Sequence, residues 1–126
     1  MPWVLLPLLT AVAYLQVRHA GFIWDDDQHL TENPCVVGPA GFLDIWTSAH
    51  ARICPLAISS FWLQHKAWGL NPLPYHLVNV AMHAGAALAL WRALLALRVR
   101  GAWIGAALWA LHPVQVESVA WITELK

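Results

Sequence analysis

The feature that most constrains the fold is a long apolar stretch at residues 75–97, in which Arg92 is the only charged residue. About 20 apolar residues suffice for a helix to cross the hydrocarbon layer of a membrane. The whole chain has 126 residues, of which 60% are hydrophobic and 11% are charged, whereas soluble domains carry about 25% charged residues. We therefore expect a membrane protein with a transmembrane helix at about 75–97.

Two further apolar segments predict membrane helices. The first covers about residues 2–22, if Arg18 and His19 are taken to lie near the far interface. A secretory signal peptide is the rival interpretation, but the start has no Lys or Arg and no clear cleavage site follows. The second covers about residues 102–125 and is expected to break at His112-Pro113, because proline lacks a backbone donor and disfavours helix in the residue before it.

The basic residues give these segments an orientation. Arg92, Arg98 and Arg100 gather around the turn between the second and third apolar segments. Basic residues in short loops mark the cytoplasmic side. The long connection at about 23–74, and the later segment with Glu117, are therefore expected on the outer side.

The outer loop should contain some helix. A helical turn is expected at 27–32, because Asn33-Pro34 is a turn signal. Residues 55–68 should form an amphipathic helix that lies at the membrane interface, or alternatively a core helix of a soluble part. Its expected apolar sector contains Ile58, Phe61, Trp62 and Trp68. The fold class is then all-α, with multi-pass transmembrane helices and a long outer loop that carries an interfacial amphipathic helix.

Two cysteines, Cys35 and Cys54, fall in this outer loop. Nothing in the sequence fixes their separation in space, so a disulfide is one interpretation and two free thiols, which we favour, are the other.

Three adjacent carboxylates, Asp25, Asp26 and Asp27, follow the first apolar segment in a chain with seven acidic residues. Contiguous carboxylates repel one another, so at least one should hold its proton unusually well unless a cation or a basic partner compensates. The cluster is therefore a candidate for a general base or for a site that binds a divalent metal ion. The competing interpretation is a solvated cap at a helix N-terminus.

A polar stripe also runs along the segment at 75–97, where His76, Asn79 and His83 share one helical face. Polar groups in a bilayer are costly, so this face should contact protein. The two histidines are about 10 Å apart along a helix, too far to share one metal ion. Hydrogen bonds between helices are the favoured interpretation, and metal binding is the alternative.

Several motifs together resemble one family. They are the Asp-Asp pair, PLAISSFWL at 55–63, GLNP at 69–72, YHLVNV at 75–80 and HPVQVESVA at 112–120. From about Phe22 onward the chain resembles the N-terminal part of the tetratricopeptide-linked membrane glycosyltransferases, which are relatives of the protein O-mannosyltransferases with the GT-C fold. The runs at 75–80 and 112–120 are the most specific of these pieces.

The resemblance implies a glycosyltransferase that moves a sugar from a polyprenyl-phosphate donor to an acceptor protein or glycan at the outer face. It also implies that an acidic residue of the first outer loop is the general base. By position, Asp25 and Asp26 match the acidic pair, and Asp27 is an additional carboxylate. His112 and Glu117 match a second outer motif, which would orient the donor phosphate or the acceptor.

Arg52 is the expected partner of the donor phosphate. Here Ile53 and Cys54 separate it from Pro55, whereas the related pattern often places a basic or aromatic residue directly before that proline. No cofactor other than a divalent metal ion at Asp25, Asp26 and Asp27 is indicated.

The resemblance and composition also suggest partners and location. The lipid bilayer, the donor and the acceptor are the expected partners, and nucleic acid is not, because the net charge is zero and no basic patch is present. We expect an integral protein of a bacterial inner membrane, with its acidic loop on the periplasmic side. The sequence stops inside an apolar pattern, so we interpret it as the N-terminal part of a longer enzyme that is inactive alone.

Two other function classes compete with this interpretation. A membrane transporter or a scaffold without catalytic activity would use the carboxylates and the polar stripe as an ion path, but transport carboxylates usually lie within apolar segments. A metal sensor would use the seven histidines, which lack close spacing of the zinc type.

Overall fold

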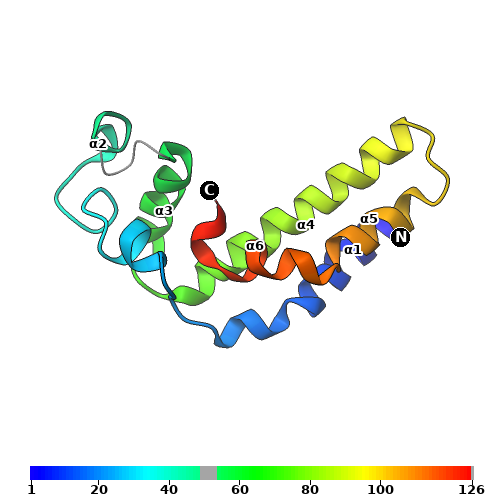
Figure 1. Ribbon diagram of the computed structural model, residues 1–126, viewed down its shortest axis with the longest axis horizontal. Coiled ribbons are helices and arrows are strands. Elements are labelled where there is room, and N and C mark those ends of the chain that lie inside the picture. The colour runs from blue at the N-terminus through cyan, green and yellow to red at the C-terminus, as the bar shows by residue number, and fades with distance from the viewer. Residues whose placement is uncertain (49–53, 126) are drawn as a thin grey trace.

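The computed structural model describes residues 1–48 and 54–125, and this part of the chain contains helices and turns but no β-strand (Figure 1). The expected all-α fold is thus confirmed for it. The α-helices are α1 (Pro2–Ala13), α2 (Phe42–Thr47), α3 (Pro55–Trp68), α4 (Pro72–Ala96), α5 (Ala102–Ala110) and α6 (Val116–Ala120). Four short helical turns join them: the 3-10 helices η1 (Leu15–His19), η3 (Pro113–Gln115) and η4 (Ile122–Leu125), and the π-helix η2 (Asp27–Thr31).

The longest helix, α4, is the axis on which the other elements pack. It begins three residues before the expected position because Asn71 caps it, its side chain accepting a hydrogen bond from the Leu73 N–H (3.2 Å), and Pro72 suits the first turn. Its 25 residues correspond to about 37 Å at the rise of an α-helix. Among the described residues, α4 is the one helix long and apolar enough to cross a membrane.

Helices α1 and α5 pack beside α4 toward its C-terminal end (Figure 1). Their shared core is rich in alanine, which lets helix backbones approach closely. It consists of Leu6, Ala87, Trp91, Ala102, Ala106, Ala107 and Ala110. Trp3 extends this contact, since its ring meets the edge of Trp91 at 5.3 Å and lies under the Arg92 guanidinium at 5.2 Å.

The first helix is shorter than the expected 2–22. The α-helix ends at Ala13, and the chain continues as the tighter turn η1. Residues three apart point to the same side in a 3-10 helix, and Tyr14 and Val17 are both buried here, in a cluster with Val80 and Val119. The 3-10 winding thus places Tyr14 and Val17 on one side of the chain, where both pack against α4 and α6.

The third apolar segment is broken at His112-Pro113, as predicted. Helix α5 ends at Ala110, His112 is extended (φ −69°, ψ 133°), and the chain resumes as η3 and α6. A second break that the sequence did not indicate follows at Trp121, which is also extended (φ −86°, ψ 122°).

The segment between η1 and α4 forms a packed lobe rather than an open connection. Elements η2, α2 and α3 surround a core at the N-terminal end of α4 (Figure 1). That core contains Leu30, Cys35, Val36, Ile45, Ala57, Ile58, Phe61, Tyr75 and Ile122. The predicted helical turn at 27–32 is present as η2, and α2 is an additional helix.

Helix α3 was expected to turn its apolar sector toward the membrane interface, and this is wrong for two side chains of that sector. Ile58 and Phe61 are 0% and 1% exposed because they pack against the apolar side chains of the lobe. That side of α3 therefore faces protein rather than the membrane surface. Leu56 and Leu63, on another side of the helix, are exposed.

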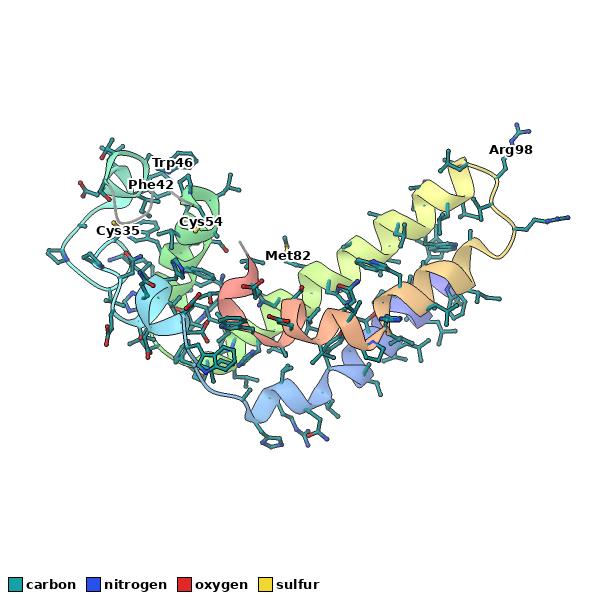
Figure 2. The ribbon with its side chains drawn as sticks, in the orientation of Figure 1. Cys35, Phe42, Trp46, Cys54, Met82 and Arg98 are labelled. Atoms are coloured by element: carbon teal, nitrogen blue, oxygen red, sulfur yellow. The ribbon has the colours of Figure 1, made fainter. Side chains whose placement is uncertain are left out.

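The ends of α4 differ in charge. Element η2, which contains Asp27, lies near the N-terminal end of α4, whereas Arg98, in the turn between α4 and α5, lies at the opposite end (Figure 2). The membrane orientation that these charges indicate stays a prediction.

Both cysteines are free, and the Cys35 Sγ lies 3.4 Å from the Ser48 Oγ.

Candidate functional site

The acidic run follows a strained turn. Trp24 has a positive φ of 48°, a conformation that bulky L-residues rarely adopt. Two reciprocal hydrogen bonds hold the turn: the Asp26 N–H donates to the Ile23 carbonyl (3.0 Å), and the Ile23 N–H donates to the Asp26 Oδ2 (2.9 Å). The Asp27 N–H also donates to the Trp24 carbonyl (3.2 Å).

Asp26 is fully buried and connects two distant parts of the chain. Its Oδ1 accepts a hydrogen bond from the Thr123 N–H (3.1 Å), 97 positions later in the sequence. A buried carboxylate is costly unless its oxygens accept hydrogen bonds, and both oxygens of Asp26 do so. Asp26 therefore connects the turn at residues 23–27 to η4.

The other two carboxylates lie in different surroundings. Asp25 is half-buried, and Asp27 is exposed and accepts a hydrogen bond from the Thr31 hydroxyl (2.9 Å). Within residues 1–48 and 54–125, no three His, Cys, Asp or Glu side chains are grouped so that they could hold a metal ion. The three aspartates thus do not fit the expected divalent-metal site.

A pocket of about 400 Å³ lies beside this turn. We call it the tryptophan pocket, and its lining residues are Ala20, Gly21, Ile23, Trp24, Val116, Glu117, Ala120 and Trp121. The rings of Trp24 and Trp121 meet edge to face at 5.4 Å. Glu117 thus lines the same pocket as Trp24, the residue that directly precedes the acidic run.

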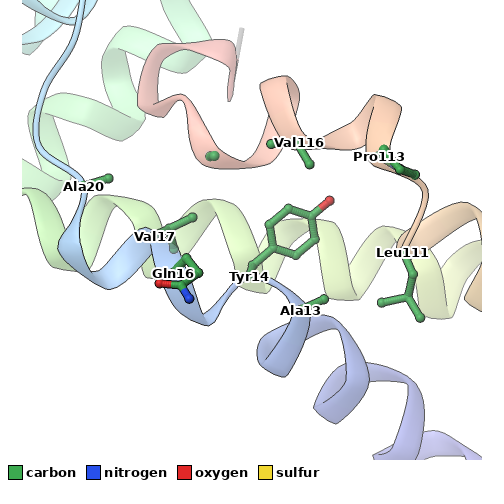
Figure 3. A pocket seen from close by; sticks show the side chains of 9 residues that line it. Ala13, Tyr14, Gln16, Val17, Ala20, Leu111, Pro113 and Val116 are labelled. Atoms are coloured by element: carbon green, nitrogen blue, oxygen red, sulfur yellow. The ribbon is translucent and has the colours of Figure 1, made fainter.

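Figure 3 shows a second pocket, of about 430 Å³. It adjoins the first pocket, because Ala20, Val116 and Ala120 line both. We call it the apolar pocket. Its other lining residues are Ala13, Tyr14, Gln16, Val17, Leu111 and Pro113. This lining contains no charged side chain, in contrast to the tryptophan pocket.

His112 lies apart from the acidic run. Its Nδ1 accepts a hydrogen bond from the Val114 N–H (3.2 Å), so it caps the turn that follows the helix break. It does not line the tryptophan pocket, although its neighbours Leu111 and Pro113 line the apolar pocket. Arg52, the expected phosphate partner, lies outside the described residues.

The polar stripe on α4 makes the predicted hydrogen bonds to the broken segment. The Asn79 Nδ2 donates to the carbonyls of Trp121 (3.0 Å) and Ile122 (3.1 Å). The His83 Nε2 donates to the Ala110 carbonyl (2.9 Å), whose usual helical partner, the Val114 N–H, is bonded to His112. Two of the three side chains of the stripe thus pair with backbone at the breaks rather than form an ion path.

The third member of the stripe, His76, is different. It is 1% exposed, and within the described part of the chain neither ring nitrogen has a hydrogen-bond partner of good geometry. Its polar surroundings are the Asp26 carboxylate and the backbone of Ala20, Gly21 and Ala120. His76 therefore lies beneath the tryptophan pocket, which those three residues also line.

Sequence reasoning missed two members of this site. Trp24 and Trp121 were not identified, although Trp24 adjoins the acidic run and Trp121 directly follows the motif at 112–120. An aromatic residue next to a carboxylate cluster was the signal that could have indicated the pocket.

Comparisons with known proteins identify relatives along most of the chain. It is 37% identical over 128 residues to protein O-mannosyl-transferase Tmtc1 of Drosophila melanogaster, an alignment that covers 89% of this chain and 15% of that protein. It is 33% identical over 122 residues to protein O-mannosyl-transferase TMTC2 of Mus musculus, which covers 86% of this chain and 15% of that protein. A protein O-mannosyl-transferase of Caenorhabditis elegans is 30% identical over 131 residues, or 91% of this chain and 19% of that protein.

The chain thus spans between 15% and 19% of the length of these relatives. No family model matches the chain, and no solved structure matches it significantly. The relatives named here come from animals, so the comparisons do not support the expected bacterial inner membrane.

Proposed function

The chain is homologous to the protein O-mannosyl-transferases along most of its length, and from this premise we propose that it contributes the first outer site of a membrane glycosyltransferase. The proposed reaction moves a sugar from a polyprenyl-phosphate donor to a hydroxyl group of a protein or glycan acceptor. Because the relatives are much longer, we propose that these 126 residues do not catalyse the transfer alone.

The observation that carries the proposal is the meeting of the acidic turn with the broken segment. The hydrogen bond between Asp26 and Thr123 and the contact between Trp24 and Trp121 hold the turn that carries Asp25 beside the tryptophan pocket, which Trp24 and Glu117 line. A pocket that is mostly apolar and carries a few polar groups is typical of a small-molecule site.

Asp25 has the better position for the general base. The acceptor hydroxyl must lose its proton as it attacks the anomeric carbon, and a carboxylate that reaches the hydroxyl can take that proton. Asp26 is 0% exposed and both its oxygens accept backbone hydrogen bonds, so it cannot approach an acceptor. We therefore assign Asp25 as the catalytic carboxylate and Asp26 as a positioning residue.

The sugar leaves a phosphate that is already an anion, so the protein mainly has to stabilise the departing charge. Glu117, at the pocket, would accept hydrogen bonds from hydroxyl groups of the acceptor or the sugar. The Nδ1 of His112 is engaged in its cap, which leaves Nε2 to approach the donor phosphate. No step is assigned to a metal ion, since the three aspartates do not form a site for one.

The proposed placement in the membrane is multi-pass. Helix α4 would cross the bilayer, accompanied by α1 with η1 and by the broken segment from α5 to η4, which also contact each other. The acidic turn and the tryptophan pocket would then lie at the outer interface, and Arg98 and Arg100 at the cytoplasmic one.

The experiment that tests the proposed function measures transfer of a labelled mannose from polyprenyl-phosphate mannose to a peptide rich in serine and threonine. Membranes that contain the wild-type protein are compared with membranes that contain Asp25→Asn at matched expression. Transfer that depends on Asp25 supports the proposal, and transfer that is absent from the wild type contradicts it.

A further inference from the structure

We propose that the tryptophan pocket binds the ring of a sugar, with the indole of Trp24 as the surface on which the ring stacks. This inference rests on the proposed function and deepens it, because it assigns a place to the sugar rather than to the lipid or the acceptor.

The first argument is the conformation of Trp24. It is one of two non-glycine residues with positive φ in the described part of the chain, the other being Arg98. A bulky side chain in this region is disfavoured and persists only where its surroundings fix it. The hydrogen bonds of Ile23 and Asp27 and the contact with Trp121 supply that constraint.

The second argument is exposure. Trp24 is 78% exposed although its ring touches Trp121. An indole with so much exposed surface has at least one free face, and it is not held in place by burial in a core. The turn therefore places an aromatic face at the pocket. The positive φ of Trp24 costs conformational energy, which a glycine at this position would not.

The third argument is chemical complementarity. A pyranose ring has a face of C–H groups that packs on an aromatic face, and a rim of hydroxyl groups that needs hydrogen-bond acceptors. The tryptophan pocket offers two indole rings and the Glu117 carboxylate. Its volume of about 400 Å³ lies within the usual range for small-ligand pockets, about 300–1,000 Å³.

The two pockets differ in the kind of ligand that their lining residues suit. The apolar pocket has a similar volume, but its lining has neither a tryptophan nor a charged side chain. An apolar ligand would favour that lining, whereas a ligand with both a C–H face and hydroxyl groups favours the tryptophan pocket.

The test uses methyl α-mannopyranoside as the ligand and the protein in lipid nanodiscs. Saturation-transfer NMR and a titration would measure binding to wild type, Trp24→Ala and Trp24→Phe. We expect millimolar binding to wild type, a loss of roughly tenfold or more in Trp24→Ala, and a loss of roughly threefold or less in Trp24→Phe. Trp46→Ala is the matched control, because Trp46 is an exposed tryptophan of α2 (Figure 2), and its affinity should equal that of wild type.

A third variant separates recognition from folding. Trp24→Gly suits the positive φ, so it should unfold at a temperature no lower than Trp24→Ala does. It should nevertheless lose the mannoside as Trp24→Ala does, because it lacks the ring.

Several outcomes would overturn the inference. They are the absence of binding by wild type at roughly 0.1 M mannoside, equal affinities of wild type and Trp24→Ala, and contact of Trp24 with the bilayer. The last is measured with brominated lipids, which would quench Trp24 fluorescence equally with and without the mannoside.

The same variants distinguish this inference from the proposed function. If wild type and Trp24→Ala transfer mannose with the same KM and kcat, the sugar site is wrong and the glycosyltransferase stands. If wild type binds the mannoside through Trp24 but transfers no mannose, the sugar site stands and the proposed reaction is wrong.

Discussion

The Thr123 N–H donates a 3.1 Å hydrogen bond to the Oδ1 of Asp26, which lies 97 positions earlier and is fully buried. The second oxygen, Oδ2, accepts from the Ile23 N–H at 2.9 Å. One carboxylate thus satisfies two backbone donors from opposite ends of the chain and connects the turn at Trp24 to η4.

Asp26→Ala should lower the free energy of unfolding by about 2–4 kcal/mol, because it leaves the buried Thr123 N–H and the partly buried Ile23 N–H without acceptors. Asp26→Asn should cost less, since its one carbonyl oxygen can still accept from one of the two donors. Thermal unfolding in nanodiscs measures both. Asp27→Ala is the control, because Asp27 is exposed and its replacement should cost about 0.5 kcal/mol or less. If Asp26→Ala and Asp27→Ala lower the free energy of unfolding equally, Asp26 does not hold the turn to η4.

Asn79→Leu should destabilise the packing of α4 on the broken segment by about 0.5–2 kcal/mol. The change removes the donor to the carbonyls of Trp121 and Ile122, and hydrogen bonds between membrane helices have about this strength. A denaturant titration in mixed micelles gives the value. Met82→Leu on the same helix, where Met82 is exposed, should change stability little, and a comparable loss in both variants would speak against the hydrogen bonds.

The orientation predicts which positions a membrane-impermeant thiol reagent can reach. In a background in which Cys35 and Cys54 are replaced by serine, Asp27→Cys should be labelled from outside intact cells or sealed right-side-out vesicles. Val99→Cys, in the turn between α4 and α5, should be labelled only after permeabilisation. The reverse pattern would invert the proposed topology and place the pocket on the cytoplasmic side.

Some of these features could be predicted from the sequence because they depend on local chemistry. The apolar length of residues 75–97 indicated α4, Pro113 indicated the break, and the spacing of Asn79 and His83 indicated a face that contacts protein. Each of these depends on residues that are close in sequence, so helix geometry alone suffices to predict them.

The remaining features depend on contacts between distant residues. The helical period placed Ile58 and Phe61 on one side of α3, but only the folded lobe, through Leu30, Ile45 and Tyr75, determines that this side faces protein. The sequence likewise presents three equivalent aspartates. Thr123 makes one of them different, and nothing near positions 25–27 indicates that contact.

His112→Ala separates the two roles assigned to this residue. Loss of its cap on the Val114 N–H should cost about 0.5–1.5 kcal/mol of stability, and loss of Nε2 should raise the KM for the polyprenyl-phosphate donor. His112→Asn keeps an acceptor for the cap and should recover stability without recovering KM. If His112→Asn recovers both the stability and the KM of wild type, His112 only caps the turn and does not contact the donor phosphate.

The central claim is that Asp25 acts as the base while Asp26 positions the site, and the pH dependence of mannosyl transfer tests it most directly. Wild type, Asp25→Asn and Asp26→Asn would be compared in membranes at matched expression, with kcat measured across the pH range. Asp25→Asn should lower kcat by about 100-fold or more and remove the fall in kcat toward acidic pH, because the carboxylate that acts as the base is gone. Its unfolding temperature should stay near that of wild type. Asp26→Asn should lower the unfolding temperature and keep the acidic limb of the profile. If Asp25→Asn retains kcat within about threefold of wild type together with the acidic limb, Asp25 is not the base and the account is wrong.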